Sequence, residues 1–269
     1  MKKFLWTLLL LPLVSCGTTG KMPSFKGDKI AIVAHRGFWK CDAAGNSENS
    51  IASLREAQVN GFWGSECDIH LTSDGKIIVN HNRTIEDLKI SDTPFETLSA
   101  RLLNNGEKRP SFEEYVLQMK PYKKTVLVVE FKKQPSKQIE EELIDKTIAC
   151  LESHKLFRPD RVMFISFSLN ACKYTAQKAP GFVNQYLNGD KAPKELAEMG
   201  INGIDYHYKK LLAHPEWVKE AHDLGMSVNV WTVNKSEMME KAIEWGVDAI
   251  TTNEPLRLRK LLGERELKR

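Results

Sequence analysis

Hydrophobic residues recur along this chain in two alternating patterns. Short runs rich in Val, Ile and Leu alternate with segments in which apolar residues return every three or four positions. The first pattern predicts buried strands, and the second predicts amphipathic helices. The predicted strands cover 29–35, 64–71, 76–80, 125–132, 162–168, 182–187, 203–206, 227–233 and 249–252, and the predicted helices cover 48–60, 111–119, 136–151, 169–178, 192–199, 215–224, 235–245 and 256–262.

This alternation of strands and helices predicts the fold class. Strands that alternate with helices form a parallel sheet, and eight such units in about 240 residues predict an α/β fold, a closed (β/α)₈ TIM barrel over 29–269. An open doubly wound sheet is the alternative, but no Gly-rich phosphate loop follows the first strand. Residues 82–110 are polar and aperiodic, so we expect a small irregular insertion after the second strand.

The N-terminus has the pattern of a secretion signal. A basic start precedes an apolar run over 4–14, which is too short to span a bilayer comfortably. The ending Leu13-Val14-Ser15-Cys16 resembles the lipobox of bacterial lipoproteins. We therefore expect residues 1–15 to be a signal peptide, Cys16 to carry lipid and 16–28 to form a tether. An ordinary signal peptide with an incidental cysteine is the alternative.

Charge and cysteine content exclude some classes of protein. The formal net charge is +4, and removing the leader with its two lysines lowers it to +2, which gives no indication of nucleic-acid binding. The cysteines after Cys16 form no CxxC pair, so we expect isolated thiols and neither a disulfide framework nor a zinc site. Cys67 lies on the apolar face of its predicted strand and should be buried and unbridged.

The stretch from Gly64 to Gly75 has an unusual acidic face. Side chains on a strand alternate between faces, so Glu66, Asp68 and His70 share one face and apolar residues share the other. The acidic face has no basic residue nearby in the sequence, and burying it without a partner would be costly. Carboxylate oxygens suit a hard cation such as Mg²⁺ or Ca²⁺ better than Zn²⁺. The alternative is an edge strand whose acidic face is exposed to water.

Reactive side chains also end other predicted strands, where a (β/α)₈ barrel places its active site. His35 and Arg36 end the first strand, and Glu130 and Lys132 end the third. Glu130 thus supplies a third carboxylate, and His81 follows the short extended run over 76–80. Two histidines, a cation and two basic residues suit phosphoryl chemistry, because the cation and Arg36 would hold phosphate oxygens while the histidines move protons.

An ordered set of short motifs runs from residue 30 to residue 255. The motifs are His35-Arg36-Gly37, Glu48-Asn49, Glu66-x-Asp68-x-His70-Leu71-Thr72-x-Asp74-Gly75, His81, Glu130-Phe131-Lys132, Trp231-Thr232-Val233-Asn234 and Gly246-Val247-Asp248-Ala249-Ile250-Thr251-Thr252-Asn253-x-Pro255. Each motif alone is weak, but the ordered set resembles the bacterial glycerophosphodiester phosphodiesterase family. That family is a (β/α)₈ barrel that binds one divalent cation, usually Ca²⁺ or Mg²⁺.

The resemblance implies a set of metal ligands. By position, Glu66, Asp68 and Glu130 would hold the single divalent cation, Ca²⁺ or Mg²⁺. Glu48 resembles a carboxylate beside the metal site, with a supporting role in which it pairs with Arg36 or holds a metal-bound water.

The resemblance also implies the catalytic groups. His35 and His81 would form the acid–base pair, and the division of roles between them stays open. Arg36 would contact the phosphate and the transition state. Trp231, predicted to point inward on the seventh strand, resembles an aromatic residue that lines the pocket against the glycerol.

Some positions stay open or depart from the family pattern. His70 is either a third catalytic histidine or a residue that hydrogen-bonds a carboxylate, and Lys132 either binds phosphate or only balances the carboxylates beside it. The family usually has Asp where this chain has Asn82, which leaves a charge-based role there open. Ser47-Glu48-Asn49-Ser50 replaces Pro-Glu-Asn-Thr at a helix start, where Ser47 can cap.

The sequence therefore predicts a metal-dependent phosphodiesterase that cleaves glycerophosphodiesters to sn-glycerol 3-phosphate and an alcohol, in the catabolism of phospholipid-derived diesters. Two alternatives remain. One is a phospholipase D-like lyase on the same barrel, which a wide, apolar pocket mouth would favour, and the other is a non-catalytic, cation-stabilised binding lipoprotein. Lipid on Cys16 would place the protein in the cell envelope, and Gly17 favours an outer-membrane position facing the periplasm. No oligomeric state is indicated.

Overall fold

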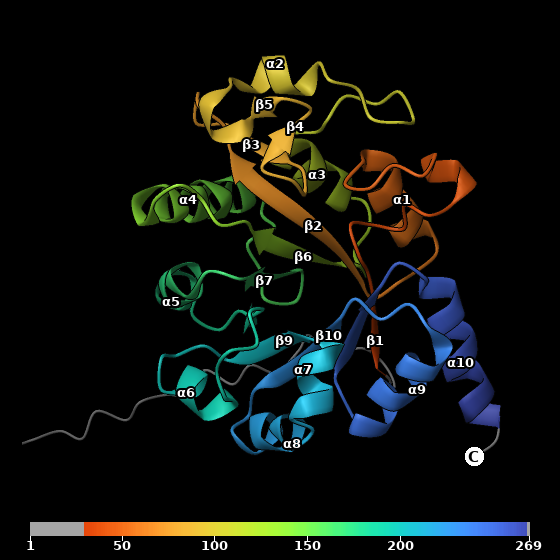
Figure 1. Cartoon of the computed structure of the whole chain (residues 1–269). Coiled ribbons are helices and arrows are strands. Elements are labelled where there is room, and N and C mark those ends of the chain that lie inside the picture. The colour runs from red at the N-terminus through yellow and green to blue at the C-terminus, as the bar shows by residue number, and fades with distance from the viewer. Residues whose placement is uncertain (1–29, 268–269) are drawn as a thin grey trace, which may run out of the picture.

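Eight parallel strands close into a barrel in the computed structural model, which describes residues 30–267 (Figure 1). Neighbouring strands pair in parallel around the ring, and the pairing of the first strand with the second closes it. The predicted (β/α)₈ barrel is confirmed, and the open sheet is excluded. The barrel strands are β1 (Ala31–Ala34), β2 (Gly64–Leu71), β6 (Val126–Phe131), β7 (Val162–Ser166), β8 (Asn184–Tyr186), β9 (Gly203–His207), β10 (Ser227–Trp231) and β11 (Ala249–Thr252).

Helices follow every barrel strand and surround the sheet (Figure 1). Among the described residues, no helix has the length and hydropathy needed to cross a bilayer. The predicted leader, Cys16 and the tether lie outside the described residues. The helices around the barrel are α1 (Ile51–Val59), α3 (Phe112–Met119), α4 (Lys137–Ser153), α5 (Leu169–Lys178), α6 (Pro193–Ala197), α7 (Tyr208–Ala213), α8 (Glu216–Asp223), α9 (Ser236–Trp245) and α10 (Pro255–Leu267), and a 3₁₀ turn, η1 (Asp42–Ala44), precedes α1.

Strand alternation divides the core into an inner and an outer layer. Along β6, Val126 and Val128 belong to an apolar cluster inside the barrel, whereas Val129 packs in the layer between the barrel and its helices. The inward series therefore continues from Val126 and Val128 to Glu130. Apolar side chains fill the lower part of the barrel, and polar side chains take over toward the carboxyl ends of the strands.

β2 is an interior strand, not an edge. It pairs with β1 on one side and with β6 on the other, and all eight of its residues are buried. The alternative of an acidic face exposed to water is therefore wrong. Cys67 is fully buried in the outer layer and makes no disulfide with any described cysteine, which confirms that prediction.

The insertion is folded, contrary to the irregular segment that we expected. After a turn, β3 (Ile77–Val79) pairs antiparallel with the end of β2, and short elements follow beside that end of the barrel (Figure 1). Five residues form a separate apolar cluster over this segment: Ile78, Ile85, Ile90, Phe95 and Leu98. The remaining elements are β4 (Thr84–Ile85), β5 (Leu88–Lys89), a 3₁₀ turn η2 (Ile90–Asp92) and α2 (Phe95–Ser99).

Glu107 ties this insertion to the barrel. Its carboxylate accepts hydrogen bonds from the backbone N–H groups of Ile51 and Ala52, at 3.0 and 3.2 Å. These groups belong to the first turn of α1, where helical N–H groups have no partner within the helix and where negative charge is stabilising. The insertion therefore supplies a carboxyl group that accepts hydrogen bonds at the start of the first barrel helix.

Candidate active site

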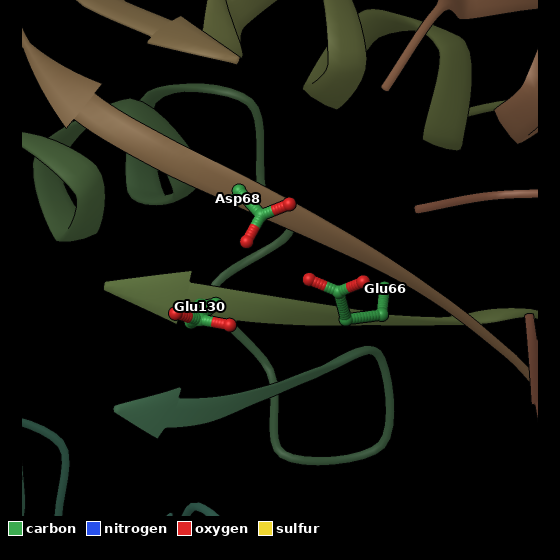
Figure 2. Close-up of side chains that lie close together, drawn as sticks. All are labelled: Glu66, Asp68 and Glu130. Atoms are coloured by element: carbon green, nitrogen blue, oxygen red, sulfur yellow. The ribbon is translucent and has the colours of Figure 1, made fainter. Parts of the chain in front are cut away.

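Three carboxylates converge inside the barrel from two neighbouring strands. Glu66 and Asp68 point inward from β2, and Glu130 points inward from β6, where it lies opposite Asp68 in the strand register (Figure 2). One carboxylate oxygen from each lies within 4.8 Å of the others, and all three side chains are buried. The three predicted metal ligands are therefore brought together.

Two basic residues, Arg36 and Lys132, lie close to these carboxylates. Lys132 Nζ lies 2.8 Å from Glu130 Oε1 and 3.2 Å from Asp68 Oδ1. Arg36 donates its backbone N–H to Glu66 Oε2 at 2.7 Å, and its Nε lies 3.7 Å from Asp68 Oδ2. Lys132 thus pairs with two of the three carboxylates, as its charge-balancing role requires, and its phosphate-binding role stays a prediction.

The three carboxyl groups differ in pKa because their partners differ. Burial and the charges of Asp68 and Glu130 raise the pKa of Glu66 well above its usual range. Burial and Asp68 raise the pKa of Glu130 to about 7. Burial acts in the same direction on Asp68, but Lys132, His81 and Arg36 together hold the pKa of Asp68 well below its usual range.

The donor set fits a hard divalent cation. Glu66 Oε1 is buried and has no hydrogen-bond partner among residues 30–267, which leaves a lone pair directed into the site. Three carboxylate oxygens are the ligands that Mg²⁺ and Ca²⁺ prefer, and neither sulfur nor imidazole belongs to the cluster. Glu66, Asp68 and Glu130 are therefore suited to hold such an ion.

Asn49 positions both Asp68 and the backbone around Arg36. Its Nδ2 donates to Asp68 Oδ2 at 2.8 Å, and its Oδ1 accepts from the Asp68 backbone N–H at 3.2 Å. Asn49 and Arg36 both have left-handed backbone angles, with φ of 55° and 57°, and the Asn49 N–H donates to the Arg36 carbonyl at 3.0 Å. Strained backbone of this kind persists where surrounding contacts fix it, as at many functional sites. The sequence signal was the Glu48-Asn49 motif, but it did not reveal this role.

Glu48 is available to the site because α1 begins later than predicted. The helix starts at Ile51, and its cap is Ser50, whose Oγ accepts from the Ser53 N–H at 2.9 Å. The prediction that Ser47 caps the helix is therefore wrong, and residues 47–49 form a loop. From this loop Glu48 Oε2 accepts from Arg36 Nη1 at 2.7 Å, which is one of the two supporting roles expected for it.

The two catalytic candidates His35 and His81 are each oriented by an amide. His35 Nδ1 lies 2.7 Å from Asn253 Oδ1, and His81 Nδ1 lies 3.0 Å from Asn82 Oδ1. An amide oxygen can only accept, so each Nδ1 carries a hydrogen and each neutral ring keeps an unprotonated Nε2. Sequence reasoning missed the role of Asn253, although the residue lies in one of the motifs that it identified.

Burial opposes protonation of both histidines. Burial and Arg36 lower the pKa of His35 to about 4, while the charge of Asp68 acts in the opposite direction. Burial also lowers the pKa of His81, and Asp68 again opposes the shift. The charge of Asp68 thus favours the protonated form of both rings, although burial outweighs it.

His70 is placed differently from either role considered for it. Its Nε2 lies 3.4 Å from the backbone carbonyl oxygen of His81, and no carboxylate contact is present among the described residues. Burial lowers the pKa of His70 to about 4, so the ring is neutral at physiological pH. The contact holds the segment that carries His81, which makes His70 a positioning residue.

Trp231 lies at the end of β10, and two unpredicted rings pack against it. Its Nε1 donates to the Asp205 carbonyl at 2.9 Å. Phe167 and His207 pack edge-on against its ring, with centroids 5.4 and 5.1 Å away. The inward position predicted for Trp231 is consistent with this placement, and the aromatic wall is larger than the sequence indicated.

A fourth inward carboxyl group, Asp205, was also missed. It is buried on β9, and its Oδ1 has no hydrogen-bond partner within the described part of the chain. Burial and the charge of Glu130 raise the pKa of Asp205 well above its usual range. A neutral Asp205 adds no further negative charge beneath the cluster. The signal was available, since Asp205 lies between Ile204 and Tyr206, which pack outward.

A cavity of about 350 Å³ lies beside this cluster. One wall comes from the loop before α1, including Glu48 and Asn49, and the other comes from the insertion. His81 is part of the lining, and Asn49 joins the lining to Asp68. The cavity is therefore lined by one catalytic candidate and is connected to the carboxylates through Asn49, although none of the three carboxylates is part of its lining.

A closed (β/α)₈ barrel that gathers three carboxylates, an arginine and two histidines at the carboxyl ends of its strands defines a phosphoric diester hydrolase. The glycerophosphoryl diester phosphodiesterase family model matches residues 35–257. The chain belongs to this family and is an enzyme of the glycerophosphodiester phosphodiesterase class.

Relatives of this class match most of the chain. A glycerophosphodiester phosphodiesterase from Parabacteroides distasonis has a crystal structure with a TM-score of 0.85 and 39% identity, covering 88% of this chain and 98% of that chain. The glycerophosphodiester phosphodiesterase of Bacillus subtilis is 27% identical over 90% of this chain and 89% of its own length. An Oleispira antarctica phosphodiesterase, solved with the product sn-glycerol-3-phosphate, has a TM-score of 0.72 and 22% identity, covering 87% of this chain and 96% of that chain.

Proposed function

We propose that the chain hydrolyses glycerophosphodiesters to sn-glycerol 3-phosphate and an alcohol with the help of one divalent cation, Ca²⁺ or Mg²⁺. The observation that carries the proposal is the convergence of Glu66, Asp68 and Glu130 within 4.8 Å, in a chain that also holds the Nδ1 atoms of His35 and His81 against an amide each. The product bound to the Oleispira antarctica relative supports the nature of the phosphorylated product.

The cation supplies positive charge that stabilises phosphate oxygens, as in other metal-dependent phosphoryl transfers. Arg36 adds a second positive group beside Asp68 Oδ2, and Glu48 accepts a hydrogen bond from its guanidinium at 2.7 Å. Lys132 stays close to Glu130 and Asp68 and limits the net charge of the cluster. Asn49 fixes the Asp68 carboxylate through two hydrogen bonds.

The surroundings of the two histidines suggest a division of roles. His35 is neutral above a pKa of about 4 and has Nε2 unprotonated, so it suits the general base. His81 lines the cavity beside the site, where a departing alcohol can lie, so it suits the general acid. In the first step His35 takes the proton of the substrate 2-hydroxyl, whose oxygen attacks phosphorus, and His81, in its doubly protonated form, gives its Nε2 proton to the leaving oxygen. The charge of Asp68 favours this protonated form of His81. Water then opens the cyclic phosphate with the roles reversed.

Hydrolysis assays with and without EDTA test this proposal. Glycerophosphoglycerol and glycerophosphocholine are incubated with the purified barrel, 29–269, and sn-glycerol 3-phosphate is measured. We expect EDTA to abolish product formation and Ca²⁺ or Mg²⁺ to restore it. Turnover that is unaffected by EDTA would exclude the metal-dependent mechanism, and the absence of any turnover with added cations would exclude the hydrolase.

The lyase alternative predicts a cyclic phosphate as the final product. The cavity has a mixed lining of amide and charged side chains, such as Asn104 and Arg109, and not the wide apolar mouth that would favour the lyase. Phosphorus NMR of the reaction separates the two, because a lyase accumulates the cyclic ester and the hydrolase does not. The non-catalytic binder predicts no phosphorus-containing product at all.

We also propose that lipid on Cys16 anchors the protein at the cell envelope, in an outer membrane facing the periplasm. Residues 1–15 would be the cleaved leader and 16–28 the tether to the barrel. The support is the lipobox-like Leu13-Val14-Ser15-Cys16 sequence. Fractionation of cells that express the full chain tests it: Cys16→Ser should move the enzyme from the membrane fraction to the soluble fraction, and an unchanged distribution would exclude the anchor.

A further inference from the structure

The cavity beside His81 has features of a binding subsite. Its volume of about 350 Å³ lies at the lower end of the range for small-molecule pockets. It is bounded by the loop before α1 and by the insertion, and Glu107 holds these two parts together. The floor includes Ile85, which belongs to the apolar cluster of the insertion. The walls therefore rest on folded elements.

Polar groups in these walls have unused hydrogen-bonding capacity. Thr84, Asn46 and Asn104 line the cavity, and none of their side chains hydrogen-bonds another residue in the described part of the chain. Together they offer a hydroxyl group and two amides, each of which can donate and accept. A ligand with several hydroxyl groups can satisfy such a set.

The charged groups in the walls do not favour a cation. Glu48 pairs with Arg36 at 2.7 Å, and Glu86 lies 3.4 Å from Arg101, so each acidic residue has an arginine partner. Arg109 also lines the cavity, and its guanidinium donates to neutral oxygens, including Asn80 Oδ1 at 3.2 Å. The charge of Arg109 is therefore uncompensated by a direct carboxylate contact among residues 30–267.

Aromatic groups are also scarce in this cavity. Sites for quaternary ammonium groups surround the cation with several aromatic faces. Among the described residues that line this cavity, Trp39 is the only Trp, Tyr or Phe. The other aromatic wall, formed by Phe167 and Trp231, comes from the residue after β7 and from the end of β10, and it is not part of this lining.

We propose that this cavity is the subsite for the departing alcohol and that it takes a neutral polyhydroxy alcohol, such as glycerol or inositol, in preference to choline or ethanolamine. The inference rests on the proposed function, since it assigns the leaving group of that reaction. It places the leaving oxygen beside His81, its proton donor, with hydroxyl groups directed toward Thr84 and Asn104.

A substrate panel tests the preference. The full barrel with Ca²⁺ or Mg²⁺ is assayed on glycerophosphoglycerol, glycerophosphoinositol, glycerophosphoethanolamine and glycerophosphocholine. We expect kcat/KM for the two polyol esters to exceed that for the two cationic esters by about 10-fold or more. Equal values, or a preference for choline or ethanolamine, would overturn the subsite while leaving the hydrolase intact. No turnover of any ester would instead overturn the proposed function.

A pair of matched variants locates the preference in this cavity. Thr84→Val removes a lining hydroxyl with little change of shape and should lower kcat/KM for the polyol esters about 2- to 10-fold, the scale of one hydrogen bond. Glycerophosphocholine turnover should fall by a smaller factor, because the choline group of this ester has no free hydroxyl group to pair with Thr84. Thr97→Val makes the same change at an exposed position of α2 outside the lining and should alter neither activity. A Thr84→Val enzyme with wild-type kcat/KM on every ester, together with an unaffected Asn104→Ala, would exclude the assigned contacts.

Discussion

Asn82 accepts a hydrogen bond from His81, with Oδ1 lying 3.0 Å from Nδ1 of the ring. Asn82 stands where the family pattern usually has Asp, so this chain keeps the acceptor and lacks its charge. A neutral acceptor fixes the ring orientation and the Nδ1 hydrogen, but it does not stabilise the imidazolium as a carboxylate would. The residue at position 82 therefore affects the proton affinity of His81, while either an amide or a carboxylate there can fix the orientation of the ring.

Asn82→Asp should raise the pKa of His81. A carboxylate at hydrogen-bond distance favours the protonated ring, and a general acid must be protonated to act. The limb of kcat/KM that falls at high pH should therefore move up by about 1 pH unit, while the limb set by His35 stays in place. A pH–rate profile checks this. A profile that moves at the low-pH limb, or that does not move, would contradict the acid role of His81.

Removing either histidine should lower turnover of natural diesters by a factor of about 10² to 10⁴. A nitrophenyl ester has a leaving group that needs no proton, so His81→Ala should retain most activity on it, whereas His35→Ala should not. His154→Ala is a matched control, because the ring nitrogen of that residue contacts Glu113, neither residue belongs to the site, and the change should leave both substrates unaffected. Equal losses on both substrates for His35→Ala and His81→Ala would show that the assigned roles are wrong.

The metal-free protein should lose stability as pH rises. Burial raises the folded-state pKa of Glu66, and it raises that of Glu130 to about 7, above the unfolded value of about 4.3. A carboxyl group that is harder to ionise when folded destabilises the fold once it ionises, whereas His35 and His70, whose folded-state pKa is lowered to about 4, act in the opposite direction up to their unfolded value of about 6.5. The two effects oppose one another between about pH 4 and pH 6.5, so we expect the loss of stability above about pH 6.5, where of these groups only the carboxyl groups still differ in protonation between the folded and unfolded states. Each pKa unit corresponds to about 1.4 kcal/mol, or about 3–6 °C in Tm. Thermal melts in EDTA across this range measure the slope.

Divalent cations should restore stability at pH 8 if Glu66, Asp68 and Glu130 hold them. Glu66→Gln removes one charge without changing size, so it should stabilise the metal-free protein and abolish cation binding and turnover together. Asp68→Ala should also abolish cation binding while the barrel stays folded. Calorimetric titration with Ca²⁺ and Mg²⁺ checks both variants, and wild-type affinity in either would rule out the ligand set.

Cys67→Ala should destabilise the protein by roughly 1 kcal/mol and leave turnover unchanged. Cys67 lies in the outer layer of the core, on the opposite face of β2 from its two carboxylates. Cys150→Ala is the comparison, because that side chain is only partly buried on α4 and should cost less. Denaturant titrations measure both values. A turnover defect in Cys67→Ala with an intact fold would mean that the strand register is wrong.

The pattern of hydrophobic residues was sufficient to predict the barrel because the barrel strands are buried on both of their faces, as in β2 and β6. β6 reads as an almost continuous apolar run, and Glu130 is its one charged residue, so both the strand and its reactive group could be identified. The ends of strands then indicated where His35 and Lys132 would lie. These features depend on short stretches of sequence.

The supporting contacts could not be predicted in this way. Asn253 reaches His35 only because β11 pairs with β1, across 218 positions of sequence. Asn49 acts through a left-handed backbone angle that the sequence pattern does not encode. Within the insertion, β4 and β5 have two residues each, which is too short for any periodicity to appear.

The contact between Glu107 and α1 sets a rule for chimeras between relatives. The insertion cannot be grafted as a self-contained cassette, because its last part supplies the acceptor for the N–H groups of Ile51 and Ala52. A donor segment that lacks an acid at this position would leave the N–H groups of Ile51 and Ala52 without their acceptor, although Ser50 would still cap the helix, and would loosen the loop that carries Glu48. Substrate range can therefore diversify at exposed positions within 82–106, whereas Asn82, which orients His81, and Asn105, which hydrogen-bonds Ser47 and Ala44 before α1, should be kept together with Glu107.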